Sequence, residues 1–191
     1  MTLWLTGLPS AGKSTVARAA AAALAQAGYR VEVLDGDELR RGLCADLGFS
    51  RADRETNVRR IGIAAELLAR NGIIVLVPVI APYADGRAAV RAHHEGRGTR
   101  FREAFVDTPQ SVCAERDVKG LYARQRAGEL IGLTGVDDVY EPPVEPDVVV
   151  PTVGRTVEQS VSVLLTAVAI RNACLRGSWL TCCNDRGDRR E

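Results

Sequence analysis

A phosphate-binding loop near the start of the chain is its most informative chemical feature. It consists of Gly7, Leu8, Pro9, Ser10, Ala11, Gly12, Lys13, Ser14 and Thr15. An apolar run precedes this loop and a stretch of helix formers follows it, which is the strand–GxxxxGK[ST]–helix order that holds nucleotide phosphates. We expect Lys13 to reach the β- and γ-phosphate oxygens. Ser14 would offer its hydroxyl to Mg²⁺, a hard cation that prefers oxygen ligands.

Two carboxylates are expected close to this loop. Asp35 and Asp37 directly follow the short β-branched run 31–34, so they leave the carboxyl end of a strand. Ligands bind at that edge in open α/β sheets. The sequence therefore predicts a site that combines a phosphate cradle with two acidic side chains.

The apolar runs and the segments between them predict the scaffold that positions these groups. We expect strands at residues 3–5, 31–34, 73–77, 104–106 and 148–150, and helices at 16–27, 50–72, 109–116 and 156–171. Thr108 is the expected cap of the third helix and Pro109 its first residue. Alternating strands and helices predict the α/β class: three α/β/α layers around a mostly parallel, doubly wound sheet.

The length of 191 residues fits one domain, which we expect to span residues 1–171. Residues 117–146 are rich in charge, glycine and proline. We expect a mobile lid there, because a long loop in a compact domain is usually functional. The tail at 172–191 lacks periodicity, and we expect it to be disordered.

Composition limits the classes of partner. The formal net charge of +1, with both signs interspersed, gives no field for nucleic acid or for a membrane surface. No apolar run approaches the ~20 residues that cross a bilayer, and the start of the chain lacks a signal sequence. Five cysteines without paired or metal-finger spacing indicate a reducing compartment. We therefore expect a cytoplasmic protein.

The phosphate-binding loop alone leaves kinases, GTPases and ATPases open. Residues 117–120 fit the DxxG pattern of GTPases, but no Asn-Lys-x-Asp guanine-binding motif follows. A longer series of motifs resembles the adenylylsulfate kinase family in the same order. These are DGDELRRGL at 35–43, LGFSRADRETNVRRIG at 47–62, IAPY at 80–83, FVDTP at 105–109, CAERDVKGLYARQRAGE at 113–129, GLTG at 132–135 and YEP at 140–142. The resemblance covers residues 1 to about 171.

This resemblance implies the P-loop NTPase fold and a particular reaction. Members of the family transfer the γ-phosphoryl group of MgATP to the 3′-hydroxyl of adenosine 5′-phosphosulfate. The products are ADP and 3′-phosphoadenosine 5′-phosphosulfate (PAPS), the activated form of sulfate. The expected cofactors are ATP and Mg²⁺, and relatives often form homodimers.

The resemblance also assigns roles to individual residues. Asp37 would orient the acceptor hydroxyl and accept its proton, while Asp35 would hold the water shell of Mg²⁺. Arg40, Arg54 and either Arg59 or Arg60 offer planar forks to the phosphosulfate. The remaining acceptor-side residues are Phe49, which would stack on the adenine, Asn57, Ile80, Ala81, Lys119, Gly132 and Leu133. Arg116 and Arg155 are expected beside the ATP base.

Two positions depart from the family pattern. Ala81 stands where many relatives carry a serine that has been regarded as a phosphorylation site. Since alanine has no oxygen to phosphorylate, we expect direct transfer from ATP to the acceptor. Leu133 stands where relatives often have phenylalanine. The loss of this aromatic ring would weaken stacking on the adenine by ~0.5–1.5 kcal/mol.

Two other functions stay open from the sequence. One is a P-loop kinase that acts on another small-molecule hydroxyl, which turnover of such alcohols without turnover of adenylylsulfate would indicate. The other is a catalytically silent nucleotide-binding subunit. The presence of Lys13, Ser14, Asp35 and Asp37 favours a catalyst over that second alternative.

Overall fold

The computed structural model describes residues 1–168, so the predicted tail at 172–191 and the end of the predicted domain lie outside the described residues. One five-stranded parallel sheet forms its centre, in the order β2-β3-β1-β4-β5. The strands are β1 (Thr2–Thr6), β2 (Val31–Val33), β3 (Ile74–Pro78), β4 (Phe101–Asp107) and β5 (Val148–Pro151). The predicted parallel, doubly wound sheet is confirmed.

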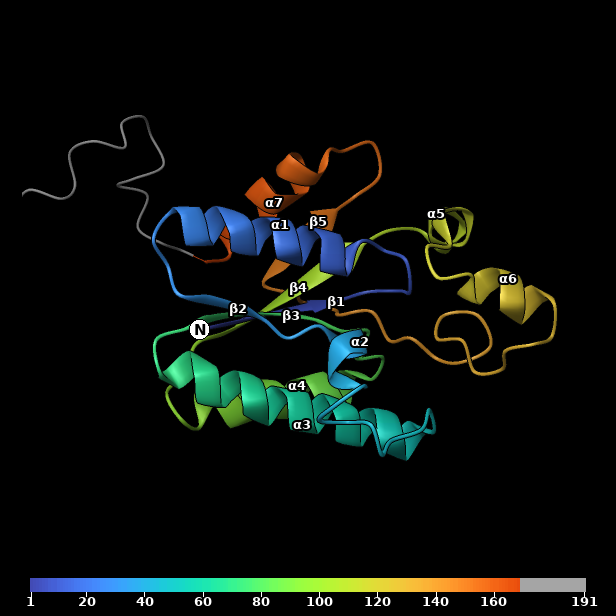
Figure 1. The fold of residues 1–191 in the computed structure, drawn as a ribbon, viewed down its shortest axis with the longest axis horizontal. Coiled ribbons are helices and arrows are strands. Elements are labelled where there is room, and N and C mark those ends of the chain that lie inside the picture. The colour runs from blue at the N-terminus through green and yellow to red at the C-terminus, as the bar shows by residue number, and fades with distance from the viewer. Residues whose placement is uncertain (169–191) are drawn as a thin grey trace, which may run out of the picture.

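Helices cover both faces of the sheet. The helices α1 (Lys13–Gln26) and α7 (Val157–Thr166) lie on one face, and α3 (Arg51–Arg70) and α4 (Ala84–Glu95) lie on the other (Figure 1). Three short helices lie beyond the carboxyl ends of the strands: α2 (Gly36–Leu39), α5 (Gln110–Arg116) and α6 (Leu121–Arg126). The two layers of long helices do not cover the carboxyl ends of the strands, and the phosphate-binding loop follows β1 at that end of the sheet.

The alternation of side chains along β1 builds a separate core on each face. Leu3 and Leu5 pack in the cluster under α1 and α7, and Trp4 packs with Phe101 in the cluster under α3 and α4. Successive side chains of a strand point to opposite faces, which is why a strand buried on both sides is apolar at every such position. The central strand is thereby fixed from both sides, directly before the loop that it presents.

The structure corrects one predicted helix start. Pro109, not Thr108, is the residue that precedes α5, and no side chain caps this helix. The Thr108 hydroxyl instead donates to the carbonyl oxygen of Ala11 at 3.0 Å, so this residue supports the phosphate-binding loop. Capping boxes begin α3, at Ser50 and Asp53, and α7, at Thr156 and Gln159.

The sequence patterns do not predict α2, α4 and α6. The reason is clear for α4, since Tyr83 at its N-cap makes no side-chain cap bond. The carboxylate of Glu141 instead accepts the N–H of Ala84 at 2.6 Å. For α6, the carboxylate of Asp117 accepts the N–H groups of Tyr122 and Ala123. Caps from distant residues, or across a glycine turn, leave no local start signal.

Two helical glycines at the packed pair α3 and α4 provide a stability test. A Cβ added at Gly62 would lie 2.7 and 2.9 Å from the two methyl groups of buried Val90, whereas one at Gly86 would lie 3.7 Å from Val58. We expect Gly62→Ala to lower the free energy of unfolding by about 1–2 kcal/mol, because overpacking exceeds the gain in helix propensity. Gly86→Ala, the matched control, should raise it by up to about 1 kcal/mol. Urea unfolding of both variants checks this, and a stabilised Gly62→Ala variant would contradict it.

Candidate active site

The phosphate-binding loop adopts a backbone that its sequence makes accessible. Gly7 and Gly12 have φ of 154° and 103°, a region that L side chains rarely adopt. A Cβ at Gly7 would also lie 2.7 Å from the carbonyl oxygen of Val106 in β4. Glycine is therefore required at position 7 both for the turn and for close packing on the neighbouring strand.

Lys13 lies inside this loop as a buried cation. Its ammonium donates to the carbonyl oxygens of Gly7 at 2.9 Å and Leu8 at 2.7 Å. Burial lowers the pKa of Lys13 from its usual value of 10.5 to about 8. A buried ammonium that is hydrogen-bonded to neutral carbonyls suits a polyanionic ligand, because phosphate oxygens would compensate its charge.

Asp35 is held by its surroundings more firmly than Asp37. Asp35 is 3% exposed, accepts the N–H of Asp37 at 3.1 Å as the N-cap of α2, and pairs with Arg18 at 3.2 Å. Among residues 1–168 no group of three or more His, Cys, Asp or Glu could hold a metal ion. Mg²⁺ in nucleotide sites needs only one or two protein ligands besides phosphates and water. Ser14 and the fixed carboxylate of Asp35 fit that requirement.

Asp37 is exposed and contacts a residue that is distant in the sequence. Its carboxylate pairs with the ammonium of Lys119, which lies in the segment between α5 and α6. The chain contains only two lysines, Lys13 and Lys119, and the structure brings both to the predicted active site. The lid segment thus reaches a carboxylate that the sequence analysis assigned to the acceptor hydroxyl.

An exposed aromatic ring lies directly before α3. Phe49 is 69% exposed, and the guanidinium of Arg40 lies over its ring at 4.5 Å from the centroid. Arg40 is held there by a hydrogen bond to the carbonyl oxygen of Gly48 at 2.9 Å. A large exposed ring costs free energy unless something covers it, so Phe49 is well suited to stack on a flat ligand.

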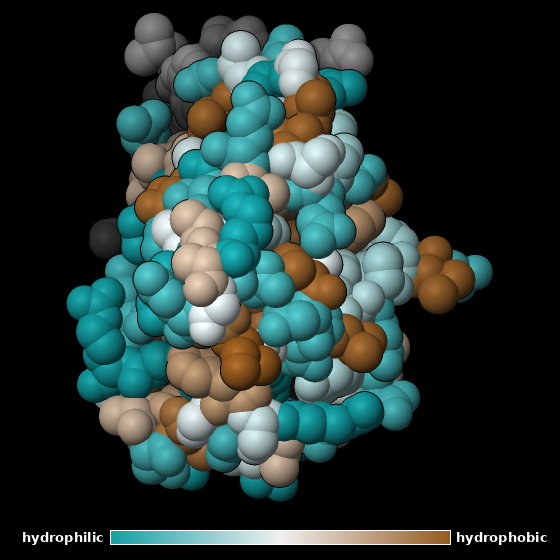
Figure 2. Space-filling view, turned by 90° about the vertical axis from the view of Figure 1, so that its right-hand side faces the viewer, coloured by the Kyte–Doolittle hydropathy of each residue, from teal (hydrophilic) through white to brown (hydrophobic). Residues whose placement is uncertain are grey.

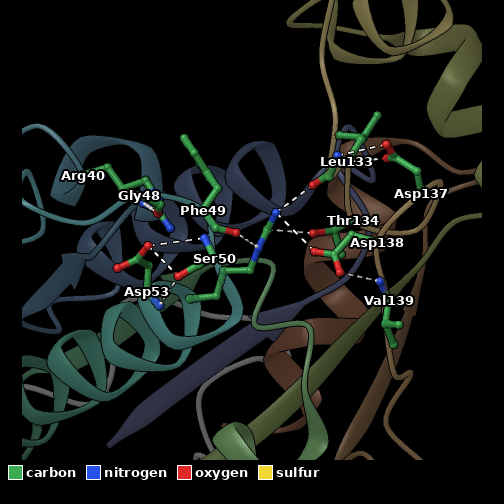
Figure 3. Close-up of polar contacts among 12 residues, drawn as sticks. Arg40, Gly48, Phe49, Ser50, Asp53, Leu133, Thr134, Asp137, Asp138 and Val139 are labelled. Carbon is green, nitrogen blue, oxygen red and sulfur yellow. Dashed lines mark hydrogen bonds and ion pairs between the residues drawn. The ribbon is translucent and has the colours of Figure 1, made fainter. Parts of the chain in front are cut away.

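Arg54 joins the start of α3 to the loop at 132–139, and Figure 3 shows these contacts. Its guanidinium donates to the carbonyl oxygens of Phe49 and Gly132 and to the hydroxyl of Thr134, at 2.7–2.9 Å. The carboxylate of Asp138 lies 3.3 Å away. In this structure Arg54 thus links the start of α3 to the loop at 132–139, and its guanidinium is not free.

One buried polar atom beside Arg54 lacks a partner. Asn57, one turn further along α3, is 7% exposed, and its Oδ1 has no hydrogen bond within the described part of the chain. Buried polar groups are normally paired, so this oxygen is available to a ligand donor. Of the two alternatives for a further anion-binding arginine, Arg60 is instead paired with Asp46 at 2.6 and 2.9 Å.

Arg116 holds the outer side of the phosphate-binding loop. Its guanidinium donates to the carbonyl oxygen of Ala11 at 3.3 Å and to the Thr152 hydroxyl at 3.0 Å. Arg155 lies exposed in the same turn between β5 and α7 as Thr152. The two arginines assigned to the ATP base therefore lie on the β5 side of the loop, away from Phe49.

Leu133 and Ala81 are both enclosed by protein. Leu133 is 5% exposed and belongs to the same buried cluster as Ala11 and Tyr122. Ala81 is 3% exposed, has a φ of 44° and follows Ile80 just beyond the end of β3.

Figure 2 looks onto the end of the molecule where α5 and α6 lie and shows apolar residues in small separate patches among hydrophilic ones.

Sequence reasoning did not find several residues that the structure places at the site. The hydroxyl of Tyr122 donates to the carbonyl oxygen of Pro9 at 3.1 Å, which joins the lid helix α6 to the phosphate-binding loop. Thr134 and Asp138 hold Arg54, and Asp137 accepts the N–H groups of Gly132 and Leu133. They belong to quoted or neighbouring motif segments, but nothing in their residue types alone indicates these contacts.

The parallel sheet and the glycine-rich loop that holds Lys13 define a P-loop kinase of small molecules. The chain belongs to the adenylylsulfate kinase family, because the sequence profile described as adenylylsulphate kinase matches residues 1–151.

Individual relatives agree with this placement. An adenylyl-sulfate kinase of Rippkaea orientalis is 53% identical over 162 residues, covering 85% of this chain and 87% of the relative. A probable adenylyl-sulfate kinase of Synechocystis is 56% identical over 148 residues, covering 78% and 81%. The solved Mycobacterium tuberculosis APS kinase CysC, in complex with AMPPNP and APS, is 46% identical with a TM-score of 0.85, covering 87% of this chain and 96% of that one.

The lowered pKa of Lys13 predicts a pH dependence of nucleotide affinity. A polyphosphate binds the charged lysine, so above about pH 8 the free enzyme must first take up a proton. We expect the Kd of a non-hydrolysable ATP analogue to be flat below this pH and to rise by up to about tenfold per pH unit above it. Calorimetry between about pH 6.5 and 9.5 measures this dependence.

The two lysines make the control direct. Lys13→Met should bind the ATP analogue weakly at every pH and should lose the pH dependence of the Kd. In the Lys119→Met variant, Lys13 is the one remaining lysine, so ¹³C-lysine spectra report its titration alone. A Lys13 midpoint near its usual 10.5, or a flat affinity profile, would contradict the prediction.

Proposed function

We propose a role for each residue of this site in one phosphoryl-transfer reaction. The chain is an adenylyl-sulfate kinase that transfers the γ-phosphoryl group of MgATP to the 3′-hydroxyl of adenosine 5′-phosphosulfate, giving PAPS and ADP in sulfate activation. The supporting observation is that the phosphate-binding loop holds the buried ammonium of Lys13, while the exposed carboxylate of Asp37, close to that loop, pairs with Lys119.

The donor side binds ATP through the phosphate-binding loop, residues 7–15. Lys13 exchanges its carbonyl partners for β- and γ-phosphate oxygens, and its charge opposes the negative charge that the transferred group carries. Mg²⁺, when bound beside Ser14 and Asp35, supplies further charge neutralisation on the β- and γ-phosphates. Arg116 and Arg155 lie where the ATP base would extend from this loop.

The acceptor side binds adenosine 5′-phosphosulfate between α3 and the lid. Phe49 stacks on the adenine, and the unpaired Oδ1 of Asn57 accepts a hydrogen bond from a donor of the nucleotide. The guanidinium groups of Arg40 and Arg54 bind its anionic groups. Ile80, Ala81, Gly132 and Leu133 line the enclosed end. Lys119 contacts the acceptor nucleotide, which requires its ion pair with Asp37 to open or to be shared.

Asp37 orients the 3′-hydroxyl and accepts its proton. Its exposed carboxylate can approach a ligand, whereas the carboxylate of Asp35 is committed to the start of α2 and to Arg18. Ala81 supplies no oxygen at the position where relatives carry serine, so the phosphoryl group passes directly from ATP to the acceptor. Positioning and charge neutralisation are sufficient for such a transfer.

Replacing the Asp37 carboxylate tests this division of roles. We expect Asp37→Asn to lower kcat by at least about tenfold, because the amide cannot accept the hydroxyl proton, while the free energy of unfolding changes by less than about 0.5 kcal/mol at this exposed position. Glu38→Gln, which alters the neighbouring exposed carboxylate, is the matched control and should keep full activity. A coupled ATP assay with adenylylsulfate and with a panel of other alcohols measures both variants. Full activity of Asp37→Asn would refute the role.

We further propose that residues 1–171 form one kinase domain with a mobile lid at about 117–146, and that the protein is cytoplasmic. Supporting the domain, one sheet and its helices extend through residues 1–168. Supporting the location, Cys44 and Cys113 are free and buried. No helix among the described residues is both long and apolar enough to cross a bilayer.

We also propose that the chain forms a homodimer through the outer face of α3 and α4. A groove of about 660 Å³ lies between these helices, lined by Gly62, Gly86, Ala89 and others. Ile63 and Leu67 on α3 are 42% and 43% exposed, one turn apart. A relative from Thiobacillus denitrificans, 37% identical, is described as a hexameric APS kinase, which shows assembly within the family.

The dimer proposal predicts a change of mass on mutation. Light scattering of the wild type should give about twice the chain mass of 20.5 kDa. The double variant Ile63→Glu and Leu67→Glu should give the single-chain mass, because charged side chains are excluded from an apolar interface. The matched control, Val118→Glu and Ile131→Glu on the exposed lid, should remain dimeric. A monomeric wild type would overturn the proposal.

A further inference from the structure

Arg87 in the first turn of α4 is a buried cation to which the reaction described above gives no role. It is 4% exposed and uses its guanidinium in three directions. Nε donates to the Glu103 carboxylate at 2.7 Å, Nη1 to the carbonyl oxygen of Ala81 at 2.8 Å and Nη2 to the carbonyl oxygen of Glu141 at 2.7 Å. Two of its three partners are therefore backbone groups of separate loops.

The first of these loops leads into the acceptor side of the cleft. Ala81 has a φ of 44°, which is the left-handed region that non-glycine residues adopt only when their surroundings enforce it. Its carbonyl oxygen accepts a charge-assisted hydrogen bond from Arg87 in the buried interior. Arg87 thus fixes the orientation of the peptide that follows Ile80 and Ala81.

The second loop is the end of the lid. The N–H of Glu141 donates to the carbonyl oxygen of Pro82 at 2.8 Å, and the Glu141 carboxylate accepts the N–H of Ala84 at 2.6 Å. The preceding residue, Tyr140, shares a hydrogen bond of 3.1 Å with the hydroxyl of Thr6, directly before the phosphate-binding loop. The segment 140–141 therefore connects the lid both to the loop at 80–84 and to the end of β1.

We propose that Arg87 is a positioning residue for the acceptor: one guanidinium, neutralised by Glu103, holds the backbone at Ala81 and the end of the lid at Glu141 in fixed register. The inference rests on the proposed placement of Ile80 and Ala81 at the acceptor side. Planar forks with donors in several directions hold such geometry, and a lysine ammonium on a flexible stem does not reproduce it.

The substitution Arg87→Lys separates positioning from simple charge pairing. The lysine can keep its ion pair with Glu103 but cannot reach both carbonyl oxygens. We expect the KM for adenylylsulfate to rise about tenfold, with the KM for ATP within about twofold of wild type. The melting temperature should fall by only a few degrees, ~5 °C or less.

Arg91 provides the matched control. It lies one turn further along α4, pairs with Asp147 at 2.7 Å and approaches Glu103 to 3.8 Å, and it makes no hydrogen bond to the backbone of either loop. Arg91→Lys should leave both KM values unchanged. A merely structural role of Arg87 would instead lower the melting temperature and change both substrates' KM values alike.

The result that overturns the proposal is a wild-type KM for adenylylsulfate in Arg87→Lys, or an equal rise in the KM for ATP. If this variant does not fold, Glu103→Gln tests the same connection, because it removes the carboxylate that orients Nε of Arg87 and leaves both backbone carbonyl oxygens in place. It should raise the acceptor KM about threefold, and an unchanged value would overturn the proposal. Asn57→Ala is run beside them: if it leaves the acceptor KM unchanged, the acceptor-site assignment itself fails, independently of Arg87.

Discussion

The buried ammonium of Lys13 is the interaction on which the rest of the site depends. Burying a charge in the protein interior is unfavourable in free energy unless the charge is compensated. Two backbone carbonyl oxygens compensate the ammonium of Lys13 only in part. The lowered pKa of Lys13 reflects this incomplete compensation of its charge. Phosphate oxygens would complete it, so the loop favours a polyanion partly because the ammonium lacks full compensation without one.

Keeping this lysine in place requires that the loop around it be fixed from outside. Side chains from other elements hold its carbonyl oxygens: Thr108 and Arg116 contact Ala11, and Tyr122 contacts Pro9. Arg116 directly precedes the proposed lid at 117–146, and Tyr122 lies within it. The segment at 116–122 and the phosphate-binding loop are therefore linked by hydrogen bonds, so the position of one affects the shape of the other.

The sequence predicted the parts of this structure that depend on local patterns. The five apolar runs form the five strands, and the helices predicted at 50–72 and 156–171 begin within one residue of the predicted starts, at capping boxes of Ser50 and Thr156. Features determined by distant partners were missed. The start of α4 is capped by Glu141, 57 positions away, and the hydroxyl of Thr108 bonds to Ala11 and not to its own helix. No window of sequence contains both partners of such contacts.

Arg54 shows the same limit within the site. Its spacing from Asn57 correctly places both on one face of α3, beside the exposed ring of Phe49. Three of its five N–H groups, however, already donate to Phe49, Gly132 and Thr134, and Asp138 lies close enough to compete for a fourth. Under the proposed function, an acceptor anion must therefore share this guanidinium with the loop at 132–139 or displace that loop from it. That proposal therefore couples binding of the acceptor to the position of the loop at 132–139 through the side chain of Arg54.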